Sequence, residues 1–159
     1  MTERPQVEFA DARFDADDAA ALVQAMRDEI AVMYDGLDLD GDTMPRAGMA
    51  ELSPPGGTFL LGYLDGVPVC SGGVKHLEGR ICEIKKMYVV PALRGQGIAR
   101  ALLHALEAKA RSMGYEIARL DTGPKQISAH GLYASEGYGA VEDFNGNPIA
   151  SFWGEKPLA

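Results

Sequence analysis

Hydrophobic and polar positions divide the chain into short strands and amphipathic helices. Alternation over residues 7–14 predicts a first strand. The run DADDAAALVQAMRDEIAVMY then carries apolar residues at helical spacing and acidic residues in its first turn, which predicts a helix capped by Asp15. The apolar face of this helix consists of Ala19, Leu22, Val23, Met26 and Ile30.

The middle of the chain predicts three antiparallel strands and a second helix. The strands are residues 58–64, 67–77 and 80–90, because Asp65-Gly66 and Glu78-Gly79 are tight-turn dipeptides between apolar runs. The helix follows at residues 98–113, with Gly114 as its end. Its expected buried face is Ile98, Leu102, Ala105, Leu106 and Met113.

The last part of the chain predicts a strand at 117–122, a short helix at 126–137 and a final antiparallel pair at 139–144 and 149–158. A meander followed by strand-helix-strand indicates an α/β fold of the α+β type. We expect a mixed, mostly antiparallel sheet with helices on both faces. The length of 159 residues suits a single domain over residues 1–159.

Residues 35–57, DGLDLDGDTMPRAGMAELSPPGG, predict an irregular loop with a short helix around 49–52. The loop is either a solvated acidic segment or a lid that faces a substrate. The acids within 38–42 have the spacing of a calcium loop. However, Thr43 and Met49 stand where such a loop needs glycine and glutamate, so we expect no metal.

Composition and charge narrow the classes of partner. Hydrophobic residues make up 47% of the chain and the formal net charge is -8, which is typical of a globular domain and unfavourable for binding nucleic acid. No apolar stretch approaches the ~18 residues that span a membrane, and the N-terminus lacks the apolar core of a signal peptide. We therefore expect a soluble cytoplasmic protein, with Cys70 and Cys82 as unpaired core residues.

The most specific feature is the turn in MYVVPALRGQGIARALL, where Pro91 ends strand pairing and a helix begins directly after Gly95 and Gly97. The first amides of a helix have no internal partners and lie at the positive end of its dipole, so they can bind a diphosphate. Arg94 and Arg100 flank the turn with positive charge. Neither G-x-G-x-x-G nor GxxxxGK[ST] is present, which argues against nicotinamide dinucleotides and nucleoside triphosphates.

The segment Arg94-Gly95-Gln96-Gly97-Ile98-Ala99 resembles the R/Q-x-x-G-x-G/A signature of the GCN5-related N-acetyltransferases, the GNAT superfamily. The order of predicted elements matches as well, so the resemblance covers nearly the whole chain. It implies acetyl-CoA as co-substrate, with its pyrophosphate on the amides of residues 95–100, including that of Arg100. It also implies that the pantetheine arm pairs like an added strand with the backbone of Met87, Tyr88 and Val89.

A second segment, QISAHGLYASEGYGAV, is similar to the family pattern N-x-x-A-x-x-L-Y-x-x-x-G-F/Y. Gln126 replaces the asparagine that touches the pantetheine, which implies an altered or longer contact. Tyr133 takes the position of the tyrosine beside the CoA sulfur, which implies that it protonates the departing thiolate. His130 lies one turn before Tyr133 and either reaches the acceptor or is an ordinary half-buried histidine.

Transfer to an amine requires that the amine lose a proton. An alkyl amine with a pKa of about 10 is neutral only in roughly one molecule in a thousand at pH 7, so a base is useful. Glu83 lies four residues before Met87, and strand alternation predicts that both project to the same side. Glu83 is either this base, acting directly or through a water, or a structural ion-pair partner of a lysine. The Met87 amide is the expected oxyanion donor.

The sequence therefore predicts an N-acetyltransferase that moves acetyl from acetyl-CoA to a primary amine of a small molecule by direct attack in a ternary complex. The acidic loop favours a cationic acceptor. A transferase for another acyl-CoA and a non-catalytic CoA-binding sensor are the alternatives. Phe152 and Trp153 indicate core packing or a dimer contact on one hand and pocket lining on the other. The resemblance implies that a homodimer is possible, and nothing in the sequence decides it.

Overall fold

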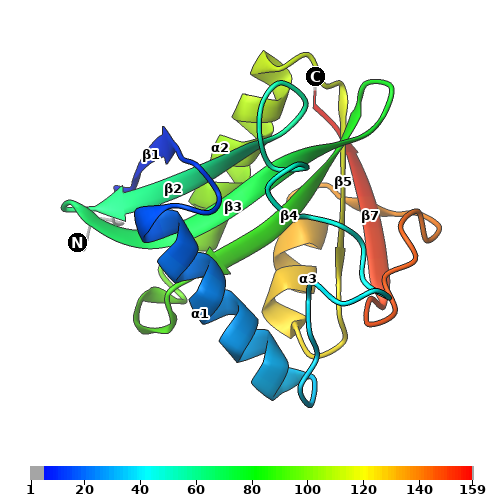
Figure 1. The fold of residues 1–159 in the computed structure, drawn as a ribbon. Helices are drawn as coiled ribbons and strands as arrows, with labels where there is room; N and C mark the ends of the chain where they lie inside the picture. Colours follow the sequence, from blue (N-terminus) through cyan, green and yellow to red (C-terminus); the bar gives the residue numbers. More distant parts are fainter. Residues whose placement is uncertain (1–5, 159) are drawn as a thin grey trace.

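The computed structural model describes residues 6–158, and its centre is one seven-stranded sheet (Figure 1). The spatial order is β1-β2-β3-β4-β5-β7-β6, and every neighbouring pair is antiparallel except β4 and β5. The mixed, mostly antiparallel sheet is thus confirmed. The strands are β1 (Glu8–Asp11), β2 (Thr58–Leu64), β3 (Val67–Glu78), β4 (Ile81–Val89), β5 (Ile117–Thr122), β6 (Gly139–Ala140) and β7 (Phe152–Pro157).

Helices cover both faces of the sheet because consecutive strand residues point to opposite sides. In β2, Phe59 and Leu61 join the core under α1, while Leu60 joins the core under α2. The α3 residue Tyr133 packs into the same core as α2. The helices are α1 (Asp17–Met33), α2 (Ile98–Ser112) and α3 (Ile127–Ser135), with a short 3₁₀ helix η1 (Pro91–Leu93) before α2.

The first helix buries the five residues that the sequence predicts, but its cap differs. Ala16 occupies the N-cap position and makes no side-chain hydrogen bond. Asp15 is not the cap, because its carboxylate instead pairs with the guanidinium of Arg13. Asp17 and Asp18 do lie in the first turn, where the helix dipole favours acidic groups.

The buried face of α2 is broader than the sequence predicts. Ala105 and Met113 are only partly buried, whereas Leu103 and Ala110 are fully buried. A stripe wider than one heptad seam is typical of a helix that packs on a sheet. Glu107 is also buried, and it accepts hydrogen bonds from Tyr138 at 2.7 Å and Lys156 at 3.0 Å.

Some predicted elements are shorter or absent in the structure. The first strand covers only Glu8–Asp11, and β6 has two residues. No helix forms at 49–52; the amide of Leu52 closes a single turn on the carbonyl of Gly48, and the Leu52 side chain fills the core under α1.

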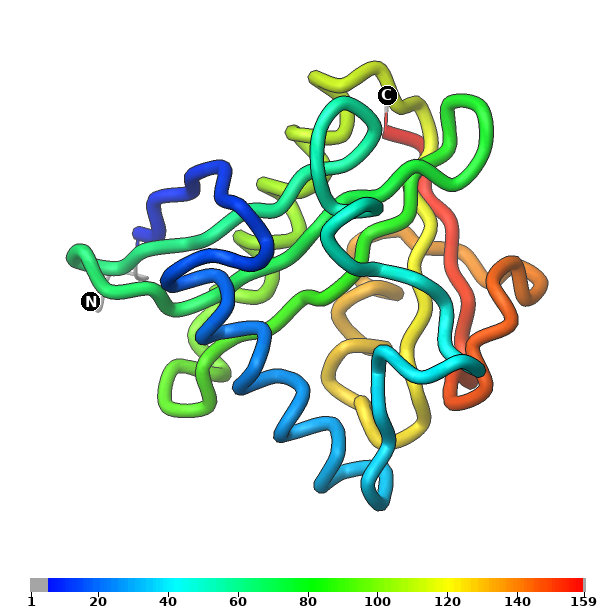
Figure 2. The backbone as a smooth tube through the Cα atoms, in the orientation of Figure 1, coloured from blue at the N-terminus to red at the C-terminus, as the bar shows by residue number. Residues whose placement is uncertain are grey.

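The feature that positions the site is the separation of β4 from β5 (Figure 2). These strands pair at only three positions, from Ile81 with Ile117 to Glu83 with Arg119. A β-bulge then places both Lys86 and Met87 opposite the single residue Gly72, with Lys86 at φ 61°. A bulge increases strand twist and bends the strand. Beyond Glu83, the edge of β4 that faces β5 therefore has no strand partner in the described structure.

Candidate active site

The larger of two adjoining cavities lies where β4 and β5 separate, and its volume is about 560 Å³. We call it the cofactor cavity. It contains every residue for which the resemblance implies contact with CoA except Gln96, whose side chain is exposed and outside the lining. The lining includes Met87, Tyr88, Val89, Arg94, Gly95, Gly97, Ile98, Ala99, Arg100, Gln126 and Tyr133.

One end of the cofactor cavity is the turn that leads into α2. Gly95 and Gly97 have φ values of 81° and 84°, a left-handed conformation that favours glycine. None of the amides of residues 95–100 donates a hydrogen bond to any residue between 6 and 158. These donors therefore remain available at the positive end of the α2 dipole, which is the arrangement that a diphosphate requires.

The two arginines beside this turn are held by nearby acids. Arg94 pairs with Glu29 at 2.7 Å and also donates to the carbonyl of Val89 at 3.0 Å. Arg100 pairs with Glu136, at the end of α3. Hydrogen bonds from His104 and Arg100 hold the pKa of Glu136 below its ordinary value. Because each arginine has an acidic partner, the backbone amides are the principal free donors for an anion.

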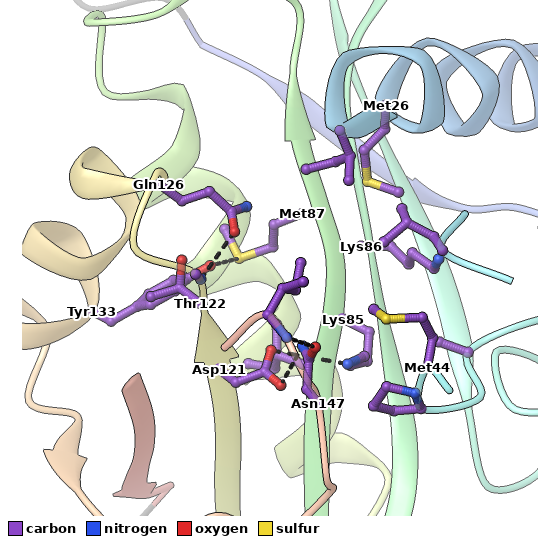
Figure 3. Close-up of a pocket in the computed structure, with 17 residues that line it drawn as sticks. Met26, Met44, Lys85, Lys86, Met87, Asp121, Thr122, Gln126, Tyr133 and Asn147 are labelled. Atoms are coloured by element: carbon purple, nitrogen blue, oxygen red, sulfur yellow. Dashed lines mark hydrogen bonds and ion pairs between the residues drawn. The ribbon is translucent and has the colours of Figure 1, made fainter. Parts of the chain in front are cut away.

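The second cavity, of about 110 Å³, adjoins the first, and we call it the acceptor cavity (Figure 3). Its walls come from α1, β4, the end of β5, the 35–57 loop and residues 147 and 149. The loop therefore faces this cavity, as the lid alternative expects, through Leu39, Met44, Pro45 and Ala47. Five residues line both cavities, namely Met26, Ile30, Met87, Gln126 and Tyr133.

Tyr133 stands at the junction of the two cavities. Its side chain is 7% exposed, and its hydroxyl donates to Met87 Sδ at 3.6 Å. Burial raises the pKa of Tyr133 above its ordinary value, and the charge of Asp121 raises it further. The phenol is therefore protonated at neutral pH, the state in which it can donate a proton or a hydrogen bond.

The prediction that Glu83 and Met87 project to the same side is wrong. Cys82 and Ile84 point into the core under α2, so Glu83 points to the opposite face. The extra residue in the bulge then reverses the alternation, and Met87 packs against the α2 core.

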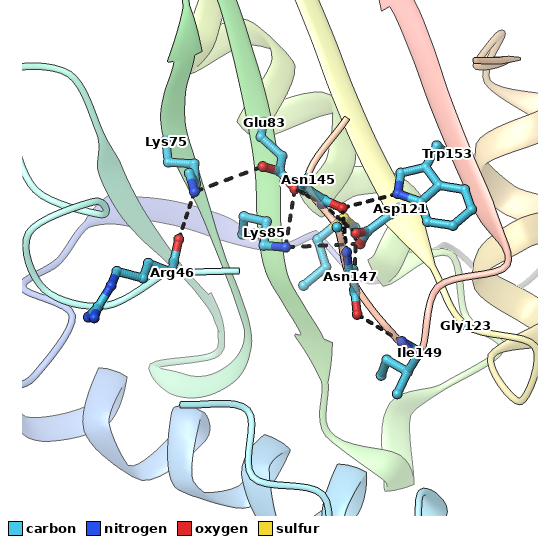
Figure 4. A network of polar contacts seen from close by, with 12 residues as sticks. Arg46, Lys75, Glu83, Lys85, Asp121, Gly123, Asn145, Asn147, Ile149 and Trp153 are labelled. Atoms are coloured by element: carbon cyan, nitrogen blue, oxygen red, sulfur yellow. Dashed lines mark hydrogen bonds and ion pairs between the residues drawn. The ribbon is translucent and has the colours of Figure 1, made fainter. Parts of the chain in front are cut away.

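Glu83 is fully buried and lines neither cavity. It pairs with Lys85 at 3.1 Å and with Lys75 at 4.0 Å, and it accepts a hydrogen bond from Asn145 at 2.9 Å (Figure 4). Lys75 in turn donates to the carbonyl of Arg46 in the 35–57 loop. Through Lys75 this network connects β3 and β4 to the 35–57 loop, and through Asn145 it connects them to the loop between β6 and β7.

Among the cavity residues that the sequence does not single out are Lys86, Asp121 and Thr122. Asp121 Oδ2 accepts hydrogen bonds from Asn145 at 2.6 Å and Asn147 at 3.0 Å. The oxygen Oγ1 of Thr122 is buried and has no hydrogen-bond partner among the described residues. The sequence did contain a signal for Asp121 and Thr122. They are polar residues at the carboxyl end of β5, which pairs in parallel with β4, and binding sites commonly form at such strand ends.

Lys86 projects from the bulge to the side of β4 opposite Met87 (Figure 3). Burial lowers the pKa of Lys86 to about 8. Lys85 and Arg27 lower this pKa further, while Asp40 and Asp38 oppose the shift. At pH 7 most molecules thus carry a charged ammonium group here.

Gln126 occupies the position implied for the pantetheine contact. Its Oε1 accepts hydrogen bonds from the amide of Gly123 at 3.0 Å and from the hydroxyl of Tyr34 at 3.4 Å. The side chain lines both cavities, and no hydrogen bond of its Nε2 to a residue within 6–158 is found. Its amide group is thus oriented with the donor nitrogen free.

His130 and Trp153 lie outside both cavities. The ring of His130 is exposed and stacks on Phe152 with the centroids 4.4 Å apart. Trp153 donates to Asn145 Oδ1 at 3.0 Å. His130 therefore does not reach the acceptor cavity, since its ring is directed to β7.

The acids of the 35–57 loop do not line the acceptor cavity, although the charges of Asp38 and Asp40 act on Lys86. Asp38, Asp40 and Asp42 are exposed and absent from its lining. Asp40 pairs with Arg27 at 3.0 Å, and Asp38 Oδ1 accepts the amide of Asp40. Within residues 6–158, no group of three or more His, Cys, Asp or Glu side chains could hold a metal ion.

Comparison with known proteins defines the class. Residues 21–138 match the model of the Acetyltransferase (GNAT) family. The seven-stranded, mostly antiparallel sheet and the three helices match the structure of an acyl-CoA N-acyltransferase. The chain belongs to the GNAT family, whose members use acetyl-CoA.

Individual relatives agree with this assignment. The uncharacterized N-acetyltransferase YjgM of Escherichia coli (strain K12) is 32% identical over 138 residues, which is 82% of this chain and 81% of that protein. An aminoalkylphosphonate N-acetyltransferase of Salmonella typhimurium is 41% identical over 63 residues, 40% of this chain and 41% of that protein. The crystal structure of an acyl-CoA N-acyltransferase from Klebsiella pneumoniae superimposes with a TM-score of 0.78 at 29% identity, covering 96% of this chain and 98% of that one.

None of the helices formed by residues 6–158 has the length and apolar character needed to cross a membrane.

The phosphate turn leads to a first prediction. Gly97→Val should weaken CoA binding by at least about tenfold, because a β-branched side chain is strained at this φ and would project where phosphates approach the amides. Isothermal titration calorimetry with CoA measures this loss. Gly66→Val is the matched control, since Gly66 has φ 78° in a turn outside both cavities. Wild-type affinity in Gly97→Val, or equal weakening in Gly66→Val, would contradict the cradle.

The lowered pKa of Lys86 leads to a second prediction. The unfolded chain binds a proton at Lys86 up to about pH 10.5, whereas the folded protein releases it near pH 8. The charged lysine therefore costs stability below pH 8, and this cost disappears as the pH rises towards 10.5. Lys86→Met should thus unfold at a higher temperature than the wild type at pH 7, by a margin that narrows above pH 8. Thermal denaturation followed by circular dichroism measures the margin, with Lys109→Met as control for the loss of one lysine.

Proposed function

We propose that this protein is an N-acetyltransferase that moves acetyl from acetyl-CoA to a primary amine of a small molecule by direct attack in a ternary complex. The observation that carries the proposal is the junction of two cavities at Met87 and Tyr133. One cavity offers free amides for a diphosphate, and the other is large enough only for a small group. A thioester at the junction would be open to attack from the acceptor side.

The cofactor cavity supports a defined orientation of acetyl-CoA. The pyrophosphate would lie on the amides of residues 95–100, next to Arg94 and Arg100. The pantetheine arm would run along the unpaired edge of β4 at residues 87–89, as an added strand does. Gln126 would offer its free Nε2 to the same arm.

In the reaction, the amine nitrogen forms a bond to the thioester carbonyl carbon, and the carbon–sulfur bond then breaks. The amide of Met87, within the bulge, would donate to the carbonyl oxygen as negative charge develops on it. The departing electrons stay on the CoA sulfur as a thiolate. No covalent enzyme intermediate is required, because Cys70 and Cys82 are both buried in the core and burial raises the pKa of each thiol to about 12.

Tyr133 would stabilise and protonate this thiolate. Its phenol is protonated, and its hydroxyl already donates to one sulfur, that of Met87. Burial raises the pKa of a phenol, and the same surroundings would raise the pKa of a thiol placed beside it. The two values therefore stay close enough for a proton to pass along one hydrogen bond.

We assign Glu83 a positioning role and Asp121 the contact with the ammonium proton. Glu83 cannot reach the acceptor, because it is fully buried among Lys75, Lys85 and Asn145. Asn145 also donates to Asp121, the single carboxylate in the described lining of the acceptor cavity. Among residues 6–158, the one polar partner found for Asp121 Oδ1 is Lys85, at 4.0 Å, so this oxygen could accept a proton and pass it to solvent.

We expect residues 1–159 to act as one domain. Acetyl-CoA as co-substrate and two unpaired cysteines support a cytoplasmic location for it. We expect neither nucleic acid nor membrane as partner. The aminoalkylphosphonate of the Salmonella relative is an amine that also carries an acid. A cationic acceptor loses its support, since the acids of the 35–57 loop are outside the cavity.

Incubation with acetyl-CoA and a panel of primary amines tests the function. We expect release of free CoA thiol above the rate without amine, and an N-acetylated product of matching mass. Comparison of acetyl-CoA with propionyl-CoA and butyryl-CoA measures acyl preference. Tight CoA binding with no thiol release on any amine would instead indicate a sensor without turnover.

The proposed acid leads to a separate prediction. Tyr133→Phe should lower kcat by about 10- to 1,000-fold, because it removes the proton donor while preserving the ring. CoA affinity, measured by calorimetry, should stay within about twofold. Tyr138→Phe is the matched control, because Tyr138 is a buried neighbour whose hydroxyl binds Glu107 outside the cavities. An unchanged kcat in Tyr133→Phe would remove this residue from the mechanism.

A further inference from the structure

The acceptor cavity contains two adjacent lysines with different surroundings. Lys85 is already neutralised, since its ammonium lies 3.1 Å from Glu83 and 4.0 Å from Asp121. Lys86 makes no ion pair and no hydrogen bond with any residue of the described part of the chain, although it lines the cavity. An ammonium without a partner in a partly buried position is the local charge that a ligand anion would compensate.

The other charged lining group lies nearer the proposed reaction centre. Asp121 shares the end of β5 with Thr122, whose buried hydroxyl has no partner among residues 6–158. Thr122 and Tyr133 both line this cavity, and Figure 3 shows Lys86 on the other side of β4 from them. A polar ligand that spans the cavity would thus meet a hydroxyl and a carboxylate at one end and a lysine at the other.

Apolar side chains line the space around these polar groups. Met26, Ile30, Leu39, Met44, Pro45 and Ile149 contribute hydrocarbon surface. The small volume of about 110 Å³ leaves room for a short carbon chain and little more. The cavity walls therefore suit a compact ligand that carries a charged group at each end.

We propose that the acceptor is a small amino acid or aminophosphonate, whose carboxylate or phosphonate binds Lys86 while its amine lies between Tyr133, Thr122 and Asp121. This inference rests on the proposed function and adds its substrate class. Lys86 is a specificity residue in this arrangement, and its ammonium disfavours polyamines and other dications. The bulge, with Lys86 at positive φ, directs the Lys86 side chain into the acceptor cavity, while Met87 lies on the other side of β4 next to the Tyr133 hydroxyl.

Matched amines test the proposal. The wild-type protein is assayed for thiol release with 3-aminopropanoate, 2-aminoethylphosphonate, propylamine and 1,4-diaminobutane. We expect kcat/KM for at least one of the two acids to exceed that for propylamine and for the diamine by about tenfold or more. The two acids distinguish a carboxylate site from a phosphonate site. Equal or higher kcat/KM for propylamine or for the diamine would overturn the proposal.

Variants then test the residue. Lys86→Met should reduce the ratio of kcat/KM for the acid to that for propylamine by about tenfold or more, with CoA affinity preserved. Lys86→Arg should restore most of the ratio, because it restores the charge. Lys109→Met is the control, since Lys109 pairs with Asp11 outside both cavities. An unchanged ratio in Lys86→Met would overturn the assignment of Lys86.

A binding measurement separates this inference from the proposed function. Propylphosphonate cannot accept an acetyl group, so its binding to the CoA complex is independent of turnover. Calorimetry should show binding to the wild type that Lys86→Met weakens at least fivefold. Thiol release that shows no preference for acids, together with no propylphosphonate binding, would refute the anion site alone. Thiol release from no amine at all would refute the proposed function, while the binding result would still decide the anion site.

Discussion

The site depends on the interruption of hydrogen bonding between β4 and β5. Parallel pairing lasts for three residues, after which the bulge at Lys86 and Met87 turns β4 away from its neighbour. Exposed backbone donors and acceptors on a strand edge favour an added strand. Here the open edge of β4 lies inside a cavity that ends at the free amides of α2. The interrupted pairing therefore provides a place for an extended ligand arm, and this place leads to the amides that would bind its diphosphate. The same bulge reverses the side-chain alternation and directs Lys86 and Met87 to opposite sides of β4, so that both line the acceptor cavity and Met87 also lines the cofactor cavity.

A buried charge network supports the acceptor side. Glu83 would be costly without partners, because an isolated carboxylate in the core loses its hydration. Lys75, Lys85 and Asn145 supply those partners, and each also contacts a second element. Lys75 reaches the 35–57 loop, and Asn145 reaches Asp121 and Trp153. The network thus holds two loops without regular structure against the sheet, where their residues form the cavity wall.

The two cavities divide recognition from chemistry. On the cofactor side, the free donors are backbone amides, because Arg94 and Arg100 are already paired with acids. Backbone amides can bind a diphosphate even though the chain has a net charge of -8. Side chains dominate the acceptor side, where Lys86, Asp121 and Thr122 differ in charge and reach. Of the described residues, only Tyr133, Met87, Gln126 and the apolar Met26 and Ile30 line both cavities, so the proposed reaction centre is confined to their junction.

Periodicity alone was sufficient for the order of strands and helices, the buried face of α1 and the turn at Gly95 and Gly97, because these depend on neighbours within about one helical turn or one hairpin. The Asp15 cap and the shared side of Glu83 and Met87 were wrong for different reasons. Asp15 pairs with Arg13, only two residues away, so a competing local contact takes the carboxylate from the helix end. The shared side fails because of the bulge opposite Gly72, which depends on the pairing of β4 with β3. Lys86, Asp121 and Thr122 could not be grouped from the sequence, since they meet only where β4, β5 and the 35–57 loop converge. Local spacing therefore determined the fold and the diphosphate turn, while tertiary packing alone decided which charges face the acceptor, because burial and pairing depend on residues far apart in the chain.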